Sequence, residues 1–196
     1  EIKECDWSSD VCSSDLLFVG WTLLSRLAGM GFSQEGKNYW ILKVSPVRSS
    51  QLLAAKFLVA YLPTVALGSI FLVGIAILQR MSLVDFGFGL VTMLLCQAGM
   101  AGILLAFGVT GANFTWDDPR KINAGGMGCL GQIVTMLFLP ISFLLFIAPL
   151  GLVSFFHLPL VYGYLGGLLI GGSVSLGCAV GPLMLVRKRV ERLGEE

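Results

Sequence analysis

Four long runs without a charged residue constrain this chain of 196 residues more than any other feature. About 20 consecutive apolar residues are enough for a helix to cross the hydrocarbon core of a bilayer. The four runs reach that length and cover residues 57–78, 86–109, 129–150 and 161–186. One such run is compatible with a buried helix of a soluble protein, but four in succession predict an all-α membrane protein with four complete spans.

The composition agrees with a membrane-integral chain. Apolar residues make up 56% of the sequence and charged residues 13%, whereas soluble domains average about 45–50% and about 25%. These values exclude a disordered chain and a nucleic-acid binder with a basic face. A fifth apolar segment, residues 16–24, is too short to span and is predicted to be the tail of another helix.

Residues 1–16 differ from everything that follows, because they are polar, rich in Ser and Asp, and without periodicity. They lack the basic start and apolar centre of a secretory signal. The stretch from Trp7 to Asp15 is similar to a translated sequencing adapter, and the alternative is a genuine polar tail. We therefore expect residues 1–16 to be foreign and residues 17–196 to form a transmembrane permease domain that lacks its first helices.

Basic residues predict the orientation, because Lys and Arg concentrate in cytoplasmic segments. They are frequent in the first, third and fifth connecting segments, as Arg26, Lys37, Lys43, Arg48 and Lys56, then Arg120 and Lys121, then Arg187, Lys188, Arg189 and Arg192. The second segment has only Arg80 and the fourth, residues 151–160, has none. The pattern predicts that residues 25–56, residues 110–128 and the C-terminus are cytoplasmic in a cell (inner) membrane protein.

The enzyme motifs that the sequence matches lie in contexts that do not fit the corresponding sites. Residues 126–131 match G-x-G-x-x-G, but they enter a membrane span, whereas a dinucleotide site needs a preceding strand. Asn113-Phe114-Thr115 matches a glycosylation triplet in a loop predicted to be cytoplasmic, and His157 is the only histidine. The sequence contains no G-x-x-x-x-G-K-[ST], so the chain itself is not expected to hydrolyse ATP. We expect no catalytic residue, cofactor or metal; Cys96, Cys129 and Cys178 are expected to pack as small apolar residues.

Small residues recur every four positions in the last span, at Gly163, Gly167, Gly171 and Ser175. Residues four apart share a helix face, and small side chains let two helices approach closely in lipid. This face is therefore predicted to pack against another helix. The other interpretation is that glycine is simply common in membrane helices.

The remaining features inside the spans are polar residues and prolines. Gln97 and Gln132 are the most polar side chains, and each is expected to form a helix–helix hydrogen bond rather than bind substrate. Pro140 and Pro149 predict a kink in the third span, or its early end in a re-entrant turn. The spans contain no ionisable Asp, Glu, Lys or Arg of the kind that ion-coupled carriers need.

The first connecting segment combines an aromatic residue with charges of both signs. Residues 37–44 predict a short interfacial helix carrying Trp40, and Ser45-Pro46 ends it. Ser49 or Ser50 is expected to cap the following helix. Two interpretations remain open for Trp40, an anchor in lipid headgroups or a docking surface for a cytoplasmic partner.

Two segments carry a family resemblance. The first reads Glu35-Gly36-Lys37, Trp40-Ile41-Leu42-Lys43, Ser45-Pro46-Val47, then Leu52 and Lys56. It resembles the loop after the second helix in the six-helix permeases of ABC-2 type exporters. The loop with Trp116, Asp117, Asp118 and Pro119 is similar to the acidic-aromatic loop between the fourth and fifth helices of that family.

The resemblance implies an ABC-2 type exporter subunit driven by a separate ATP-binding subunit. It assigns docking of that subunit to Glu35, Gly36, Lys37, Trp40, Lys43, Ser45 and Pro46. The other implied partners are membrane lipid and a second permease half or a homodimer partner, with no role for nucleic acid. The alternative is a membrane scaffold or assembly protein that transports nothing.

Overall fold

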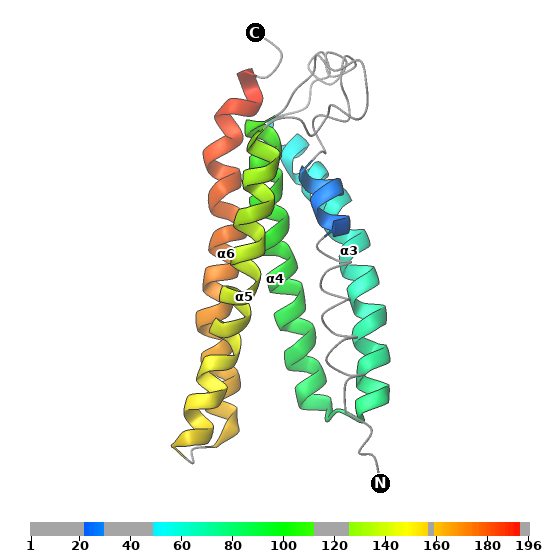
Figure 1. Cartoon of the computed structure of the whole chain (residues 1–196), viewed down its shortest axis with the longest axis vertical. Helices are drawn as coiled ribbons and strands as arrows, with labels where there is room; N and C mark the ends of the chain where they lie inside the picture. The colour runs from blue at the N-terminus through cyan, green and yellow to red at the C-terminus, as the bar shows by residue number, and fades with distance from the viewer. Residues whose placement is uncertain (1–21, 30–48, 112–125, 157–158, 193–196) are drawn as a thin grey trace.

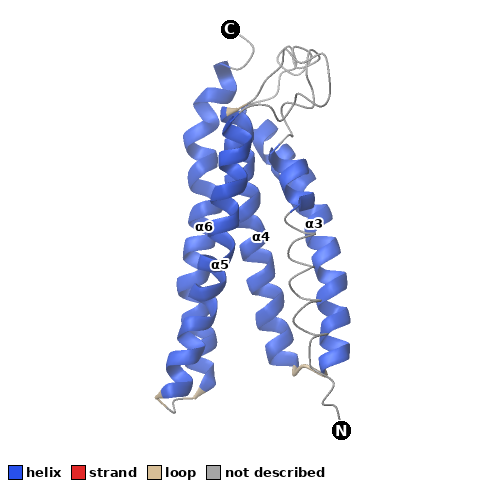
Figure 2. Cartoon of the chain, in the orientation of Figure 1, coloured by secondary structure: helices blue, strands red, loops and turns tan. Residues whose placement is uncertain are grey.

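A computed structural model of the chain describes residues 22–29, 49–111, 126–156 and 159–192. The long helices in it are α3 (Ser49–Gln79), α4 (Leu83–Thr110), α5 (Gly126–Phe155) and α6 (Leu160–Arg192), shown in Figure 1. A short helix covers residues 22–29, and the described residues contain no strand (Figure 2). Each long helix is apolar and long enough to cross a membrane, so the predicted all-α membrane fold with four complete spans is confirmed.

The helices are longer than the apolar runs that predict them. Helix α3 begins at Ser49 and continues through Lys56 into the apolar run. Both serines expected to cap it therefore lie inside the helix, and the residue before them lies outside the described residues. Its 31 residues correspond to about 46 Å at 1.5 Å per residue, against a hydrocarbon core of about 30 Å. The helix ends therefore extend beyond the hydrocarbon core.

Proline does not interrupt the third span. Pro140 and Pro149 both lie inside α5, which continues to Phe155. The alternative in which this span ends early in a re-entrant turn is therefore wrong. An unpaired backbone group is costly in lipid, so a chain that has entered the bilayer as a helix remains helical through proline when neighbouring helices support it.

Helix α4 lies at the centre of the bundle, between α3 and the α5–α6 pair (Figure 1). In its most apolar stretch 44% of the residues are buried, against 11% in α3. The buried part of α4 runs from Gly99 to Val109, interrupted only by the partly exposed Phe107. The core of the protein therefore lies in the half of the bundle that contains the C-terminal end of α4.

The helix at residues 22–29 belongs to this core. Leu24 and Ala28 are buried among the side chains of α4, while Arg26 is exposed. Residues 25–29, predicted to begin the first cytoplasmic segment, thus continue this helix. The charge on Arg26 ends the apolar run in the sequence, but Leu24 and Ala28 are four residues apart and share the face that packs on α4.

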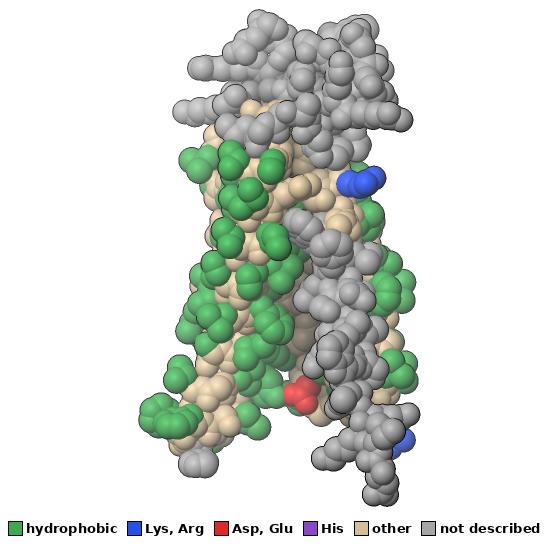
Figure 3. Space-filling view, viewed as in Figure 1, with side chains coloured by type: hydrophobic (Ala, Val, Ile, Leu, Met, Phe, Trp, Pro, Cys, Tyr) green, Lys and Arg blue, Asp and Glu red, His purple; other side chains and the backbone are tan. Residues whose placement is uncertain are grey.

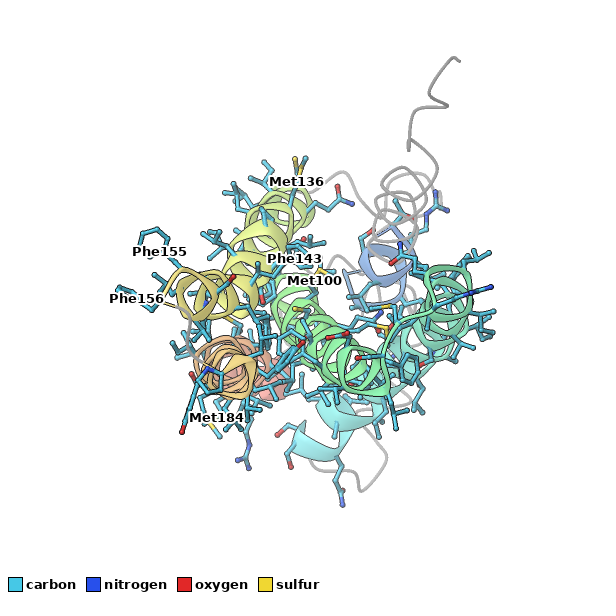
Figure 4. The ribbon with its side chains drawn as sticks, turned by 90° about the horizontal axis from the view of Figure 1, so that it is seen from below. Met100, Met136, Phe143, Phe155, Phe156 and Met184 are labelled. Carbon is cyan, nitrogen blue, oxygen red and sulfur yellow. The ribbon has the colours of Figure 1, made fainter. Side chains whose placement is uncertain are left out.

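Large apolar side chains cover the outside of the bundle (Figure 3). Figure 4 shows Met136, Met184, Phe155 and Phe156 pointing away from it, and their exposed fractions range from 64% to 79%. Exposure of such a surface to water would be unfavourable, and soluble monomers rarely expose contiguous apolar patches of this extent. The surface therefore suits lipid, in agreement with a multi-pass membrane protein.

The turn between α3 and α4 holds Arg80 in a left-handed conformation, with φ 50°. The N–H of Met81 donates to the carbonyl of Ala76 at 3.1 Å, which is the hydrogen bond of a Schellman C-terminal cap. Helix α4 then starts with Ser82 as its N-cap. Glycine is the residue that adopts the left-handed position without steric cost.

Arg80→Gly is therefore expected to increase the free energy of unfolding by about 1 kcal/mol, by removing the strain of a side chain in the left-handed region. Thermal unfolding of the detergent-solubilised protein measures the change. Arg26→Gly is the matched control and should lower stability by a similar amount, because Arg26 is an exposed residue inside a helix. Loss of stability in Arg80→Gly would contradict the assignment.

Candidate functional site

The two loops that carry the family resemblance lie outside the described residues. This applies to the first loop, with Glu35, Gly36, Lys37, Trp40, Lys43, Ser45 and Pro46, and to the second, with Trp116, Asp117, Asp118 and Pro119. His157 also lies outside them. The docking role of these residues therefore stays a prediction. The described part of the chain contains no group of His, Cys, Asp and Glu side chains that could hold a metal ion.

The small residues of α6 face α5. A Cβ atom added at Gly167 would lie 2.5 Å from the carbonyl oxygen of Phe146, and one at Gly171 would lie 2.7 Å from the Phe146 ring. At Gly163 the nearest atom is the Cα of Leu150, at 3.1 Å. Any larger side chain at Gly167 would push the two backbones apart. The fourth residue, Ser175, is fully buried and meets both α5 and α4.

A largely buried hydrogen-bonded chain joins α4, α5 and α6. The hydroxyl oxygens of Ser142 and Ser175 are 3.1 Å apart, and the sulfur of Cys96 is 3.3 Å from Ser142 Oγ. Ser142 and Ser175 have no exposed surface. Hydroxyl groups inside a membrane bundle need such partners, so these three residues fix the relative register of the three helices. We call Cys96, Ser142 and Ser175 the polar node.

Helices α4 and α6 approach most closely next to this node. A Cβ at Gly102 would lie 2.4 Å from the carbonyl oxygen of Ala179, and one at Gly99 would lie 3.1 Å from that of Ser175, both on α6. The Gly99 Cβ would also lie 2.7 Å from the Phe138 ring of α5. Neither glycine was predicted from the sequence to be a packing residue. The signal was present, because Gly99 and Gly102 are three apart on one helix face, but it was shorter than the four-residue stripe of α6.

A second polar contact lies at the other end of α4. The Ser82 hydroxyl donates to Asp85 Oδ2 at 2.7 Å and accepts from the Asp85 N–H at 3.2 Å, and the second of these is an N-cap hydrogen bond. The Tyr164 hydroxyl of α6 donates to the other carboxylate oxygen, Oδ1. Both oxygens of Asp85 are thus engaged, one within α4 and one across to α6. The acidic side chain drawn in Figure 3 lies toward that end of the bundle.

Aromatic rings adjoin this contact. The Phe88 ring of α4 meets the Tyr164 ring edge-on, with centroids 5.0 Å apart, and lies 6.5 Å from the Phe146 ring of α5. Phe146 is completely buried. We call Phe88, Phe146 and Tyr164 the aromatic cluster. It fills the space between α4, α5 and α6 on the side of the polar node nearer to Asp85.

The two glutamines inside the spans have different surroundings. The Oε1 atom of Gln97 is buried and has no hydrogen-bond partner among the described residues, so the helix–helix bond expected of this oxygen is not formed. Its Nε2 lies beside α3, 2.7 Å from where a Cβ of Gly68 would be. Gln132 lines a small cavity with Ser25 and the backbones of Gly29 and Gly128.

The glycines of the G-x-G-x-x-G match lie in helix α5. Helix α5 begins at Gly126, and a Cβ at Gly131 would lie 2.8 Å from the Cβ of Phe107. Glycine at position 131 thus serves the packing of α5 on α4. No strand precedes the match in the described residues, so the context that a nucleotide site requires is missing there.

One family model matches residues 13–192, and its description is "Putative ATP-binding cassette". The match covers most of the chain and includes all four long helices. No curated protein and no solved structure matches the chain. Neither the match, which begins at residue 13, nor the described residues support the adapter interpretation of residues 1–16. The chain belongs to this ATP-binding cassette family.

Proposed function

We propose that this member of the ATP-binding cassette family is the transmembrane permease subunit of an ABC-2 type exporter. The observation that carries the proposal is that the family match and the membrane spans coincide: residues 13–192 match, and they contain every described long helix. A region built of four apolar helices cannot be the nucleotide-binding part of a cassette, because that part requires a glycine-rich loop after a strand.

On this proposal the ATP-binding subunit would be a separate chain. It would bind at the cytoplasmic loops, with Trp40 as the apolar anchor and Glu35, Lys37 and Lys43 forming charge pairs around it. Charge pairs at the rim of an interface contribute little affinity but orient the partner. ATP binding and hydrolysis on that subunit would move the helices between two states, and a second permease half or a second copy of the chain would complete the transporter.

Co-purification tests this proposal against the alternative of a scaffold. The chain and its candidate ATP-binding subunit are co-expressed, and the chain is purified by a tag in mild detergent. The permease assignment predicts a stoichiometric complex that breaks up when the first cytoplasmic loop is altered. A chain that purifies without any ATP-binding subunit would favour the scaffold or assembly protein.

The proposed orientation places the chain in the cell (inner) membrane with the C-terminus in the cytoplasm. Single cysteines introduced at Ser45, Asn113 and Gly194 should react only with reagents that reach the cytoplasm. A cysteine at Ser154, at the far end of α5, should react with an impermeant reagent added outside intact cells. External labelling at Gly194 together with internal labelling at Ser154 would reverse the topology.

A further inference from the structure

The half of α4 next to Ser82 is less buried than the rest of that helix. None of residues 83–98 is fully buried, whereas the stretch from Gly99 to Val109 is almost entirely so. Figure 1 shows α4 and the α5–α6 pair close together in the upper half and diverging toward the lower end. The contacts that do join α4 to α6 near Ser82 therefore have a large influence on whether that end stays closed.

Those contacts come from one face of α4. Asp85 accepts the Tyr164 hydroxyl, and three residues further Phe88 packs on the same tyrosine ring. The carboxylate cannot rotate freely, because Ser82 engages its second oxygen. Tyr164 thus has two attachments to α4, a hydrogen bond to a charged group and a ring contact.

The aromatic cluster separates this contact from the polar node. On α5, Ser142 is one helical turn from Phe146, and on α6, Ser175 is one turn from Gly171, which meets the Phe146 ring. On α4, Cys96 follows Asp85 by eleven residues, or about 16 Å along the helix. A molecule that enters from the Ser82 end would therefore meet the aromatic cluster before it reaches the polar node.

One more group on this face of α4 lacks a partner. The hydroxyl of Thr92, which is four residues from both Phe88 and Cys96, is buried and has no hydrogen-bond partner among the described residues. A buried hydroxyl without a partner is costly. Water or a polar group entering from the Ser82 end would satisfy it, and nothing else in the aromatic cluster offers a polar atom except Tyr164.

We propose that Asp85 and Tyr164 form a latch that holds the aromatic cluster closed over the interior position shared by Thr92 and the polar node. When the latch opens, α6 moves away from α4 at the Ser82 end, and water reaches Thr92 and Cys96. When it is closed, water does not reach the buried hydroxyls of Thr92, Ser142 and Ser175, and Cys96 is only partly exposed. This inference goes beyond the permease assignment, since it concerns access to the bundle interior and requires no ATP-binding subunit.

Cys96 is a native reporter for this access. The other cysteines, Cys5, Cys12, Cys129 and Cys178, are replaced by alanine, and the full chain is placed in lipid nanodiscs, where both faces are open to the reagent. The rate of modification by methanethiosulfonate ethylsulfonate is then measured. The Tyr164→Phe variant removes the donor hydroxyl and keeps the ring that packs on Phe88, so it should label Cys96 about three to ten times faster than the parent.

Two controls test whether the change in labelling rate is specific to the latch. Tyr162→Phe alters an exposed tyrosine of the same helix and should leave the rate unchanged. In a parallel chain that retains only Cys178, which packs against the core cluster of the other half, Tyr164→Phe should not change the rate. Equal Cys96 rates in Tyr164→Phe and the parent would overturn the latch, and so would parallel acceleration at Cys96 and Cys178, which indicates general loosening.

Discussion

Gly102→Ala is expected to lower the free energy of unfolding by about 2–3 kcal/mol, although it adds a single methyl group. That methyl would lie 2.4 Å from the carbonyl oxygen of Ala179 and 2.6 Å from its Cα. The clashing atoms belong to the backbone of α6 and cannot rotate away. Helices α4 and α6 must therefore move apart, which also strains the contacts of the polar node.

The measurement is thermal unfolding in one detergent, followed by loss of the monodisperse peak on size-exclusion chromatography, with an expected drop of roughly 5–10 °C. Gly177→Ala is the matched control, because the same change on α6 meets no atom within 4 Å. The control should be neutral or slightly stabilising, since alanine favours helix over glycine. Equal stability of Gly102→Ala and Gly177→Ala would show that α4 and α6 are not as close as described.

Trp40→Ala is expected to weaken association with the ATP-binding subunit by about 30-fold. The estimate uses a loss of roughly 2 kcal/mol for an aromatic residue that dominates an interface, at about tenfold per 1.4 kcal/mol. Trp40 stands between charges of both signs in the loop that resembles ABC-2 type permeases. The measurement is a pull-down of the ATP-binding subunit over a range of concentrations.

The control for this substitution is His157→Ala, in the segment predicted to lie outside the cell. It should leave the association unchanged. If Trp40 only anchors the loop in lipid headgroups, both variants will retain the subunit equally, and the docking role of Trp40 is then wrong while the anchor interpretation stands.

The spans could be predicted because charge and length decide them almost alone. Lipid excludes ionisable groups and unpaired backbone, so an uncharged run of about 20 apolar residues has few alternatives to a helix. The rule does not predict how far the helix at residues 22–29 extends, because Arg26 ends the apolar run although Leu24 and Ala28 on the opposite face are buried. The exclusion of unpaired backbone also explains why α5 continues through its prolines, although proline has a low helix propensity.

Contacts between helices were less accessible to sequence reasoning. The four-residue spacing in α6 identifies a face but not its neighbour, which is α5 through Phe146 and Leu150. The bond between Asp85 and Tyr164 joins residues 79 apart in the chain. No local pattern links them, because the pairing depends on how α4 and α6 cross. Gln97 shows the same limit, since its orientation toward Gly68 depends on the position of α3.

ATP hydrolysis by reconstituted vesicles tests the central claim most directly. The purified chain is placed in liposomes with and without its candidate ATP-binding subunit, and phosphate release is followed. The permease assignment predicts no hydrolysis by the chain alone, binding of the subunit only to vesicles that contain the chain, and hydrolysis that stops when the P-loop lysine of the subunit is replaced. ATP hydrolysis by the chain alone, or failure of the subunit to bind the vesicles that contain the chain, would contradict this assignment.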